Sequence, residues 1–307
     1  MRNPWIRAAG WAVALGIVWF AGQSLVRNWE QLRSQPLDWR LQPGWILLSC
    51  LVVWLMYAIL IVAWRRMLEG WGQRLDGWTA ARIWTVSNLG KYLPGKVWAV
   101  AGMALMSKEA GIAPWAATGS AIILQALAIG TGAAVAACTG AGALESARPG
   151  TRAALIALLV AAVTGVFLLL WPPVLRRLLI LAGPDTGGGT APAAGGIVFG
   201  IACNLIAWVG YGLALWLLAR GILPDSGLTV LLSIAVFTAS YLAGFLALLV
   251  PGGIGVREGM FILLLQGPIG IGAATVLALA SRLLLTVADV GSATPFLIYP
   301  KRARVEP

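Results

Sequence analysis

Long stretches of this chain contain no Asp, Glu, Lys or Arg. They cover residues 8–26, 41–64, 110–144, 153–175, 186–219 and 226–256, and a last stretch, 259–300, is interrupted only by Arg282 and Asp289. Within a bilayer, every backbone amide and carbonyl must be hydrogen-bonded inside the spanning structure, so only helices and closed barrels cross it. The apolar runs are helix-length and lack the alternation of a membrane barrel, so the spans are predicted to be helices. Since a helix needs about 20 apolar residues to cross a bilayer, the sequence predicts an all-α, polytopic integral membrane protein with about 7–8 transmembrane helices.

The composition of the chain supports a membrane protein without a soluble part. Apolar residues make up 60% of the 307 residues and charged residues 11%, whereas a soluble globule carries about a quarter charged residues. We therefore treat residues 1–307 as a single transmembrane domain. The apolar run after Arg2 and Arg7 is interpreted as its first transmembrane helix and not as a cleaved signal peptide. The Gly-rich stretch 183–192 is a candidate boundary between two halves.

The positive charges of the chain lie mainly at the ends of the apolar runs. Basic residues flank two of the predicted loops, at Arg65, Arg66, Arg74, Arg82, Arg176 and Arg177. The positive-inside rule makes these loops and the N-terminus cytoplasmic, as in a multi-pass protein of a cell inner membrane. The net charge of +11 then points to anionic membrane lipids as partners and not to nucleic acid, because no soluble domain presents the basic residues.

Neither a metal nor a cofactor is expected from the residue types. The chain contains no histidine, which removes the commonest metal ligand and general base. The cysteines at positions 50, 138 and 203 all lie in apolar runs and share no metal-ligand spacing.

Two Pro-Gly pairs interrupt the helical pattern. Pro94-Gly95 precedes a short apolar segment, 95–107, and Pro251-Gly252 precedes another, 252–266, which ends at a new break at Gly267-Pro268. A helix that runs into Pro-Gly must stop or bend, and about a dozen helical residues rise only about 18 Å, well short of the roughly 30 Å hydrocarbon core. The sequence predicts two re-entrant or broken half-helices whose turns converge on one polar cavity.

The starts of these half-helices suit an anion. A helix that starts inside the membrane directs free amides and its positive dipole end at whatever lies before it. Lys91 and Lys96 flank the first turn, Arg257 follows the second, and the second turn is rich in glycine. A lipid phosphate is therefore a candidate ligand. The alternative is that both Pro-Gly pairs are ordinary turns with basic side chains reaching the interface.

The two breaks resemble each other in the residues that follow them. Gly-Met occurs eight and nine residues after each proline, at 102–103 and 259–260, and Pro94 and Pro251 lie about half a chain apart. Broken helices at matching positions in two halves indicate a transporter site at a repeat interface. An inverted repeat is therefore expected, although a chance match in a Gly-rich chain would look the same.

Arg282 and Asp289 are charged residues within the last predicted span. Seven residues apart on a helix, they share roughly one face, and charge inside a span is functional by default because it is costly. We expect Arg282 to pair with a carboxylate such as Glu258 or with a substrate phosphate, and we take Asp289 as a candidate charge partner. The alternative is a purely structural ion pair.

The two motifs also resemble a known family, the lysylphosphatidylglycerol synthase transmembrane region. The resemblance lies in Leu-Gly-Lys-Tyr-Leu-Pro-Gly-Lys at 89–96, Pro-Gly-Gly-Ile-Gly-Val-Arg-Glu at 251–258, and the later arginine in Ala-Ser-Arg-Leu-Leu-Leu. It implies the flippase-domain fold of the multiple peptide resistance factor, here without the synthase domain. The candidate headgroup-binding residues are Asn88, Lys91, Tyr92, Pro94, Gly95, Lys96, Pro251, Gly252, Gly253, Gly255, Arg257, Glu258 and Arg282.

Three functional hypotheses follow. The first is a non-enzymatic lipid translocase that moves an anionic, aminoacylated or polyprenyl lipid between leaflets, with Glu258 balancing charge or receiving a headgroup amine. The second is a membrane partner of a glycosyltransferase or lipid synthase that presents a lipid-linked intermediate. The third is a lipid-modifying enzyme, which the absence of histidine and of a soluble catalytic domain disfavours.

Overall fold

The computed structural model describes residues 40–92, 98–146, 194–247, 253 and 255–298, with a few residues between 156 and 173. The regular elements of these residues are all helical. The helices long and apolar enough to cross a membrane are α3 (Pro43–Glu69), α6 (Pro114–Ser146), α9 (Ala194–Ile222) and α12 (Ile271–Ile298). The predicted spans 8–26 and, almost entirely, 153–175 lie outside the described residues. The prediction of an all-α polytopic membrane protein is confirmed.

Shorter helices form two hairpins. The first hairpin consists of α4 (Gly77–Asn88), the 3-10 turn η1 (Leu89–Tyr92) and α5 (Trp98–Glu109), and the second of α10 (Val230–Leu246) and α11 (Val256–Ile269). With 12 and 14 residues, α5 and α11 rise about 18 and 21 Å, less than the roughly 30 Å hydrocarbon core. The predicted half-helices are therefore confirmed. The turns at 93–97 and 248–252, and with them the predicted cavity, lie outside the described residues.

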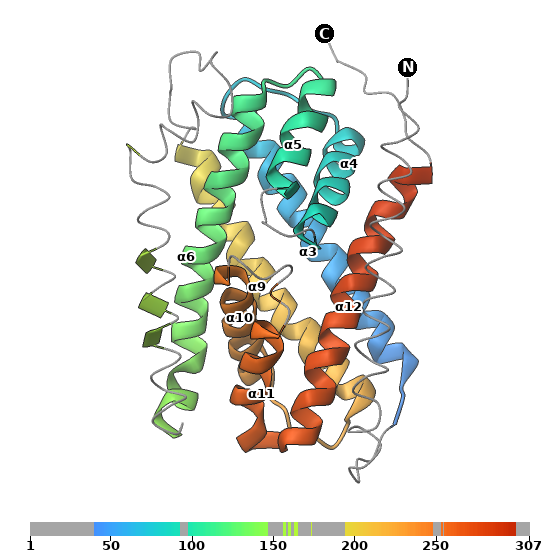
Figure 1. The fold of residues 1–307 in the computed structure, drawn as a ribbon, viewed down its shortest axis with the longest axis vertical. Coiled ribbons are helices and arrows are strands. Elements are labelled where there is room, and N and C mark those ends of the chain that lie inside the picture. Colours follow the sequence, from blue (N-terminus) through green and yellow to red (C-terminus); the bar gives the residue numbers. More distant parts are fainter. Residues whose placement is uncertain are drawn as a thin grey trace.

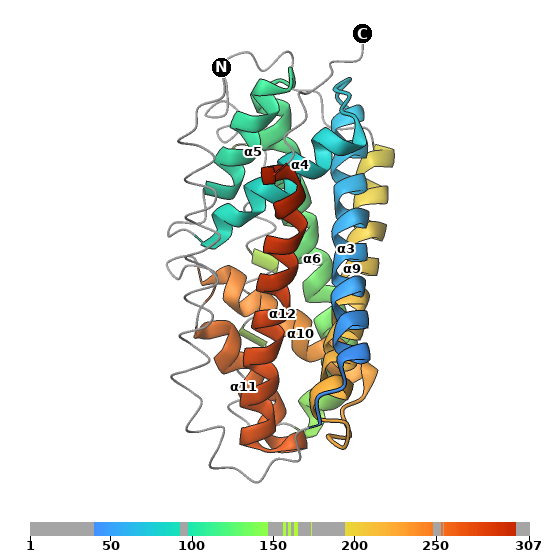
Figure 2. The same ribbon diagram turned by 90° about the vertical axis from the view of Figure 1, so that its right-hand side faces the viewer.

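The two hairpins enter the molecule from opposite ends. Figures 1 and 2 show the first hairpin at the end where α3 finishes and α6 begins, and the second at the end where α9 finishes and α12 begins. The described helices therefore repeat the order long, short, short, long, and the second set of four runs in the opposite direction. This is the arrangement of an inverted repeat. The candidate boundary 183–192 falls between α6 and α9, outside the described part of the chain.

The packing of the long helices depends on small residues. Helices α3 and α9 lie side by side, and a Cβ at Gly221 of α9 would stand 2.7 Å from Ile46 Cγ1 and 3.3 Å from the Ile46 backbone nitrogen of α3. The buried Ser49 hydroxyl donates to the Ala214 carbonyl at 2.6 Å. Close approach of backbones is how helices associate where lipid is as apolar as the side chains. The α3–α9 pair thus joins the two halves.

Local capping sets where the short helices begin. The Asp76 carboxylate accepts from the amides of Trp78 and Thr79, both at 3.0 Å, at the start of α4. The Thr229 hydroxyl caps α10 by accepting from the Leu232 amide at 3.2 Å. Both caps satisfy amides that have no partner within their helix.

The break predicted at Gly267-Pro268 is displaced in the structure. Helix α11 continues through Pro268 to its last residue, Ile269. Its C-cap is Gly270, whose φ is 82°. A proline near the end of a helix removes a single donor, whereas the positive φ of Gly270 redirects the chain into α12.

The ends of the helices agree with the charge distribution. Helix α12 ends on the same side as the α3–α4 loop (Figure 1), which follows Arg65 and Arg66 and contains Arg74. The basic residues 301, 302 and 304 follow α12 in the sequence. Helix α12 therefore ends on the side of the molecule where this basic loop lies.

Candidate functional site

Helix α12 makes an ion pair with each hairpin. Its Arg282 Nη1 lies 2.5 Å from Glu258 Oε1 at the start of α11, and its Asp289 Oδ2 lies 2.7 Å from Lys91 Nζ in η1. Seven helical residues separate the two positions by about 10 Å along the axis. The expected pairing of Arg282 with Glu258 is confirmed, and Asp289 is the charge partner of Lys91.

Asp289 is the centre of a buried polar cluster. Only 1% of the residue is exposed, and its carboxylate accepts hydrogen bonds from Tyr57 Oη at 2.7 Å, Asn88 Nδ2 at 3.2 Å and Tyr92 Oη at 2.6 Å, besides the Lys91 ion pair. A carboxylate offers about four lone-pair sites, so Asp289 is fully satisfied. We call Tyr57, Asn88, Lys91, Tyr92 and Asp289 the Asp289 cluster; it ties α3, α4 and η1 to α12.

Glu258 both caps α11 and pairs with α12. Its Oε2 accepts from the Gly255 amide at 2.6 Å while Oε1 faces Arg282. Gly255 has a φ of 82°, a conformation that glycine adopts without strain. The carboxylate therefore satisfies a helix-terminal amide and a cation at once.

Arg257 lies in a different environment from the other cations of the site. Its Nη2 donates to the Ser281 hydroxyl of α12 at 2.8 Å. The rings of Phe237, Tyr241 and Phe261 surround its guanidinium, with centroids 5.4, 5.9 and 5.5 Å from Cζ. The residue is 8% exposed, and its buried Nε has no hydrogen-bond partner among the residues that the structure describes. We call these five residues the Arg257 cluster.

Two glycines bring the second turn against α10 beside Arg257. A Cβ on Gly253, whose φ is 67°, would stand 2.6 Å from the Cα of Gly244, and a Cβ on Gly244 would stand 2.9 Å from the Cβ of Arg257. Real Cβ atoms do not approach so closely, so only glycine fits at both positions. Gly253 of the second motif and Gly244 of α10 therefore place Arg257.

The structure thus divides the predicted headgroup residues. Asn88, Lys91 and Tyr92 belong to the Asp289 cluster, whereas Gly253, Gly255, Arg257, Glu258 and Arg282 gather around the start of α11. The predicted residues Pro94, Gly95, Lys96, Pro251 and Gly252 lie outside the described residues. Among the described residues, no hydrogen bond or ion pair shares a partner between Lys91 and Arg257. Each cation is held by its own cluster.

The sequence did not single out several members of the two clusters. Tyr57 is the only tyrosine of its uncharged run, and Ser281 directly precedes Arg282, so both carried a weak signal. The aromatic residues around Arg257 carried none, because aromatic side chains in a span are most simply interpreted as packing.

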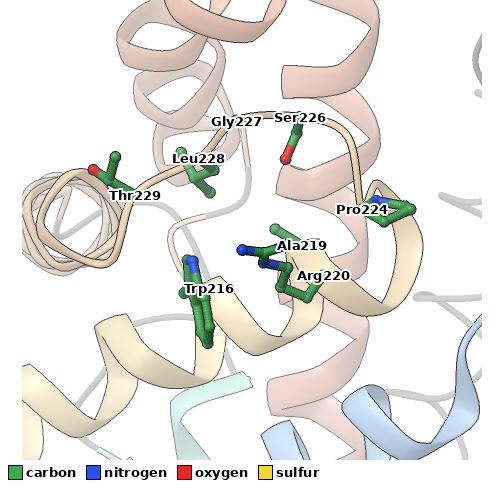
Figure 3. Close-up of a pocket in the computed structure, with 8 residues that line it drawn as sticks. All are labelled: Trp216, Ala219, Arg220, Pro224, Ser226, Gly227, Leu228 and Thr229. Atoms are coloured by element: carbon green, nitrogen blue, oxygen red, sulfur yellow. The ribbon is translucent and has the colours of Figure 1, made fainter.

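A separate cavity of about 260 Å³ lies at the α9–α10 loop (Figure 3). Its walls include Trp216, Arg220 and Thr229, and the Arg220 guanidinium lies 5.1 Å from the Trp216 ring centroid. None of the predicted headgroup residues that the structure describes lines it. Across the described ranges, no three His, Cys, Asp or Glu side chains gather as metal ligands would.

Two opposed hairpins that pair with charged side chains of one spanning helix, buried Asp289 and partly buried Arg282, define a class of membrane protein: a polytopic all-α protein built around two hairpins of short helices. The chain belongs to the family described as the lysylphosphatidylglycerol synthase TM region, whose model matches residues 7–288. That match includes both hairpins and α12 as far as Ala288. Comparison with curated proteins and with solved structures found no match.

Proposed function

We propose that the protein is a lipid translocase, which carries a lipid headgroup between leaflets along a polar path at the two hairpins. The proposal rests on the observation that opposed hairpins from the two halves both pair with charged residues of α12, buried Asp289 and partly buried Arg282. Ionisable side chains within a membrane are costly and mark substrate pathways, and inverted-repeat transporters bind substrate at broken helices near the midplane. Membership of the family supports a lipid as the substrate.

Within this proposal the basic residues of both motifs contact the lipid phosphate. The buried Nε donor of Arg257 has no acceptor within the described part of the chain, so Arg257 can bind a phosphate oxygen without giving up a carboxylate partner. Lys91 and Arg282 already hold Asp289 and Glu258, so they bind the headgroup only when a phosphate competes with those carboxylates. Lys96, in the first turn, adds a further positive charge.

We propose no catalytic step for this site. The two acids of the site, Asp289 and Glu258, are both engaged in ion pairs, and the chain has no histidine to act as a base. A role as a membrane partner that presents lipid to a glycosyltransferase or lipid synthase would use the same headgroup contacts without net movement.

For the orientation, we propose that the end bearing the α3–α4 loop faces the cytoplasm of a cell inner membrane, with the N-terminus on the same side. The support is the positive charge at that end, from Arg65, Arg66 and Arg74, which the positive-inside rule assigns to the cytoplasm.

The proposal is tested in liposomes that contain the purified protein and a trace of lipid with a fluorescent acyl chain. External dithionite bleaches only the outer leaflet unless lipid exchanges, so a translocase makes the inner label accessible. Anionic, aminoacylated and polyprenyl lipids are compared with protein-free vesicles. Equal rates in both for every lipid would exclude translocation, and lipid binding without movement would favour the presenting role.

Variants test whether Arg257 and Arg282 are required for transport. We expect Arg257→Ala and Arg282→Ala to slow transport at least about tenfold, because each leaves a buried partner or phosphate without its cation. Arg66→Ala is the matched control, because Arg66 lies on the surface with a side chain 64% exposed. Melting temperatures are measured alongside, and equal mild effects at all three positions would contradict the assigned site.

A further inference from the structure

We propose that the cavity at the α9–α10 loop binds a phosphate ester, at a site separate from the headgroup site along α12. The cavity measures about 260 Å³ and is formed by the last turns of the spanning helix α9 and the loop that follows it. Pockets for drug-sized ligands measure about 300–1,000 Å³, so this cavity has room for a headgroup but not for a whole lipid. None of its wall residues belongs to the Asp289 cluster or the Arg257 cluster, so the inference does not depend on translocation.

Arg220 gives the cavity a positive charge. Its side chain leaves the last turn of α9 and reaches into the space that the loop encloses, where the Ser226 hydroxyl also points (Figure 3). None of the ion pairs found among the described residues includes Arg220, and Asp225, the only acid of the loop 223–229, does not line the cavity. A guanidinium and a hydroxyl are both donors that phosphate oxygens accept from, so the cavity is suited to a phosphate.

The end of α9 does not require the charge of Arg220. The last carbonyls of a helix attract cations because they have no partner within the helix, and this would be the simplest role for an arginine in the last turn. Here the Ala219 carbonyl accepts from the Leu223 amide at 2.7 Å. The Gly221 carbonyl accepts from the Gln42 amide at 2.8 Å. Backbone donors thus satisfy these carbonyls, and the guanidinium of Arg220 is available for a ligand.

An apolar wall holds Arg220 in place at the membrane interface. The Trp216 ring centroid lies 5.1 Å from Arg220 Cζ and 6.3 Å from the ring centroid of Trp45 on α3, and buried Leu228 packs into the main hydrophobic core. A cation beside an indole ring is attracted to it without using its N–H donors. Tryptophans at the end of a spanning helix mark the depth of the lipid headgroups. A lipid of the leaflet at this end of the molecule is therefore the expected source of the phosphate.

Cysteine labelling measures the occupancy of this cavity directly. In a cysteine-free protein, Ser226→Cys places a thiol in the cavity wall, and Asp225→Cys places one on the same loop outside the wall. The purified protein is treated in detergent with a water-soluble maleimide while short-chain phosphatidylglycerol is titrated. We expect the lipid to slow labelling at position 226 and not at position 225. Labelling that changes equally at both positions, or at neither, would overturn the inference.

Variants at Arg220 assign the protection to its charge. The titration at position 226 gives an apparent Kd, which Arg220→Gln should raise at least about tenfold because hydrogen bonds from a charged donor are lost. Arg220→Lys keeps the charge without the fork and should retain part of the binding. Arg40→Gln is the matched control, because Arg40 lies at the same end, with its amide donating to the Ile222 carbonyl, and does not line the cavity. Equal apparent Kd values in folded Arg220→Gln and Arg40→Gln would overturn the inference.

Two further probes identify the source of the phosphate. Glycerol phosphate lacks the acyl chains, and the diacylglycerol with the same chains lacks the phosphate. Protection of position 226 by phosphatidylglycerol alone assigns the site to a lipid, and equal protection by glycerol phosphate assigns it to a free phosphate ester. Protection by the diacylglycerol equal to that by phosphatidylglycerol would overturn the inference, because the acyl chains alone would then fill the cavity.

Discussion

Replacing Asp289 by asparagine tests whether the Asp289 cluster holds the first hairpin to α12. The change keeps the size of the side chain but leaves the Lys91 ammonium without a counter-ion. Removing one partner of a buried ion pair costs about 3–5 kcal/mol. Because the Lys91 side chain keeps 28% exposure, we expect the lower end of that range, about 3 kcal/mol in the free energy of unfolding.

A double-mutant cycle separates this ion pair from general damage to the core. Asp289→Asn, Lys91→Met and the double variant are unfolded reversibly in mixed micelles and followed by circular dichroism. The double variant should cost at least about 1 kcal/mol less than the sum of the single changes, since contacting residues are coupled. The exposed pair Arg66 and Glu69 is the control, with a coupling under about 1 kcal/mol. Additivity within about 0.5 kcal/mol at Asp289 and Lys91 would refute the reasoning.

Three further changes test the turns, the caps and the topology. Gly253→Ala should destabilise the protein by at least about 1–3 kcal/mol, because of its positive φ and its approach to α10, whereas Gly259→Ala, with open space around it, should not lower the melting temperature. Asp76→Ala should cost about 1 kcal/mol at neutral pH. Partial burial acts to raise the pKa of Asp76, but amide hydrogen bonds outweigh it and lower that pKa, so the difference should vanish as the pH falls through the lowered value. In a cysteine-free background, Arg74→Cys and Asp225→Cys should react with impermeant reagents from opposite sides of the membrane, and labelling from one side would contradict the inverted arrangement.

The short helices and one ion pair could be predicted from the sequence because their signals are local. Pro94 and Pro251 mark where helices must stop, and the apolar segments predicted behind them, 95–107 and 252–266, are too short to span. Glu258 and Arg282 are oppositely charged residues of neighbouring segments, so their pairing followed from the cost of burying either alone.

The other contacts depend on how the two halves pack, which one sequence does not reveal. Lys91 and Asp289 come from opposite halves of the chain, and only the approach of η1 to α12 brings them within 2.7 Å. The aromatic residues around Arg257 come partly from α10 and partly from α11, whose alignment is set by the glycine contact between the second turn and α10. The end of α11 was misplaced because a proline was weighted above Gly270, whose positive φ is visible only in the structure.

Movement of phosphatidylglycerol across a bilayer tests the central claim most directly. Vesicles that contain the protein and labelled phosphatidylglycerol are treated with dithionite, and the fraction of label that remains protected is measured over time. Translocation predicts that protection is lost in vesicles with the unmodified protein and is kept, on the same timescale, with folded Arg257→Gln. Protection that persists with the unmodified protein, as it does in protein-free vesicles, would contradict the claim that this chain moves lipid between leaflets.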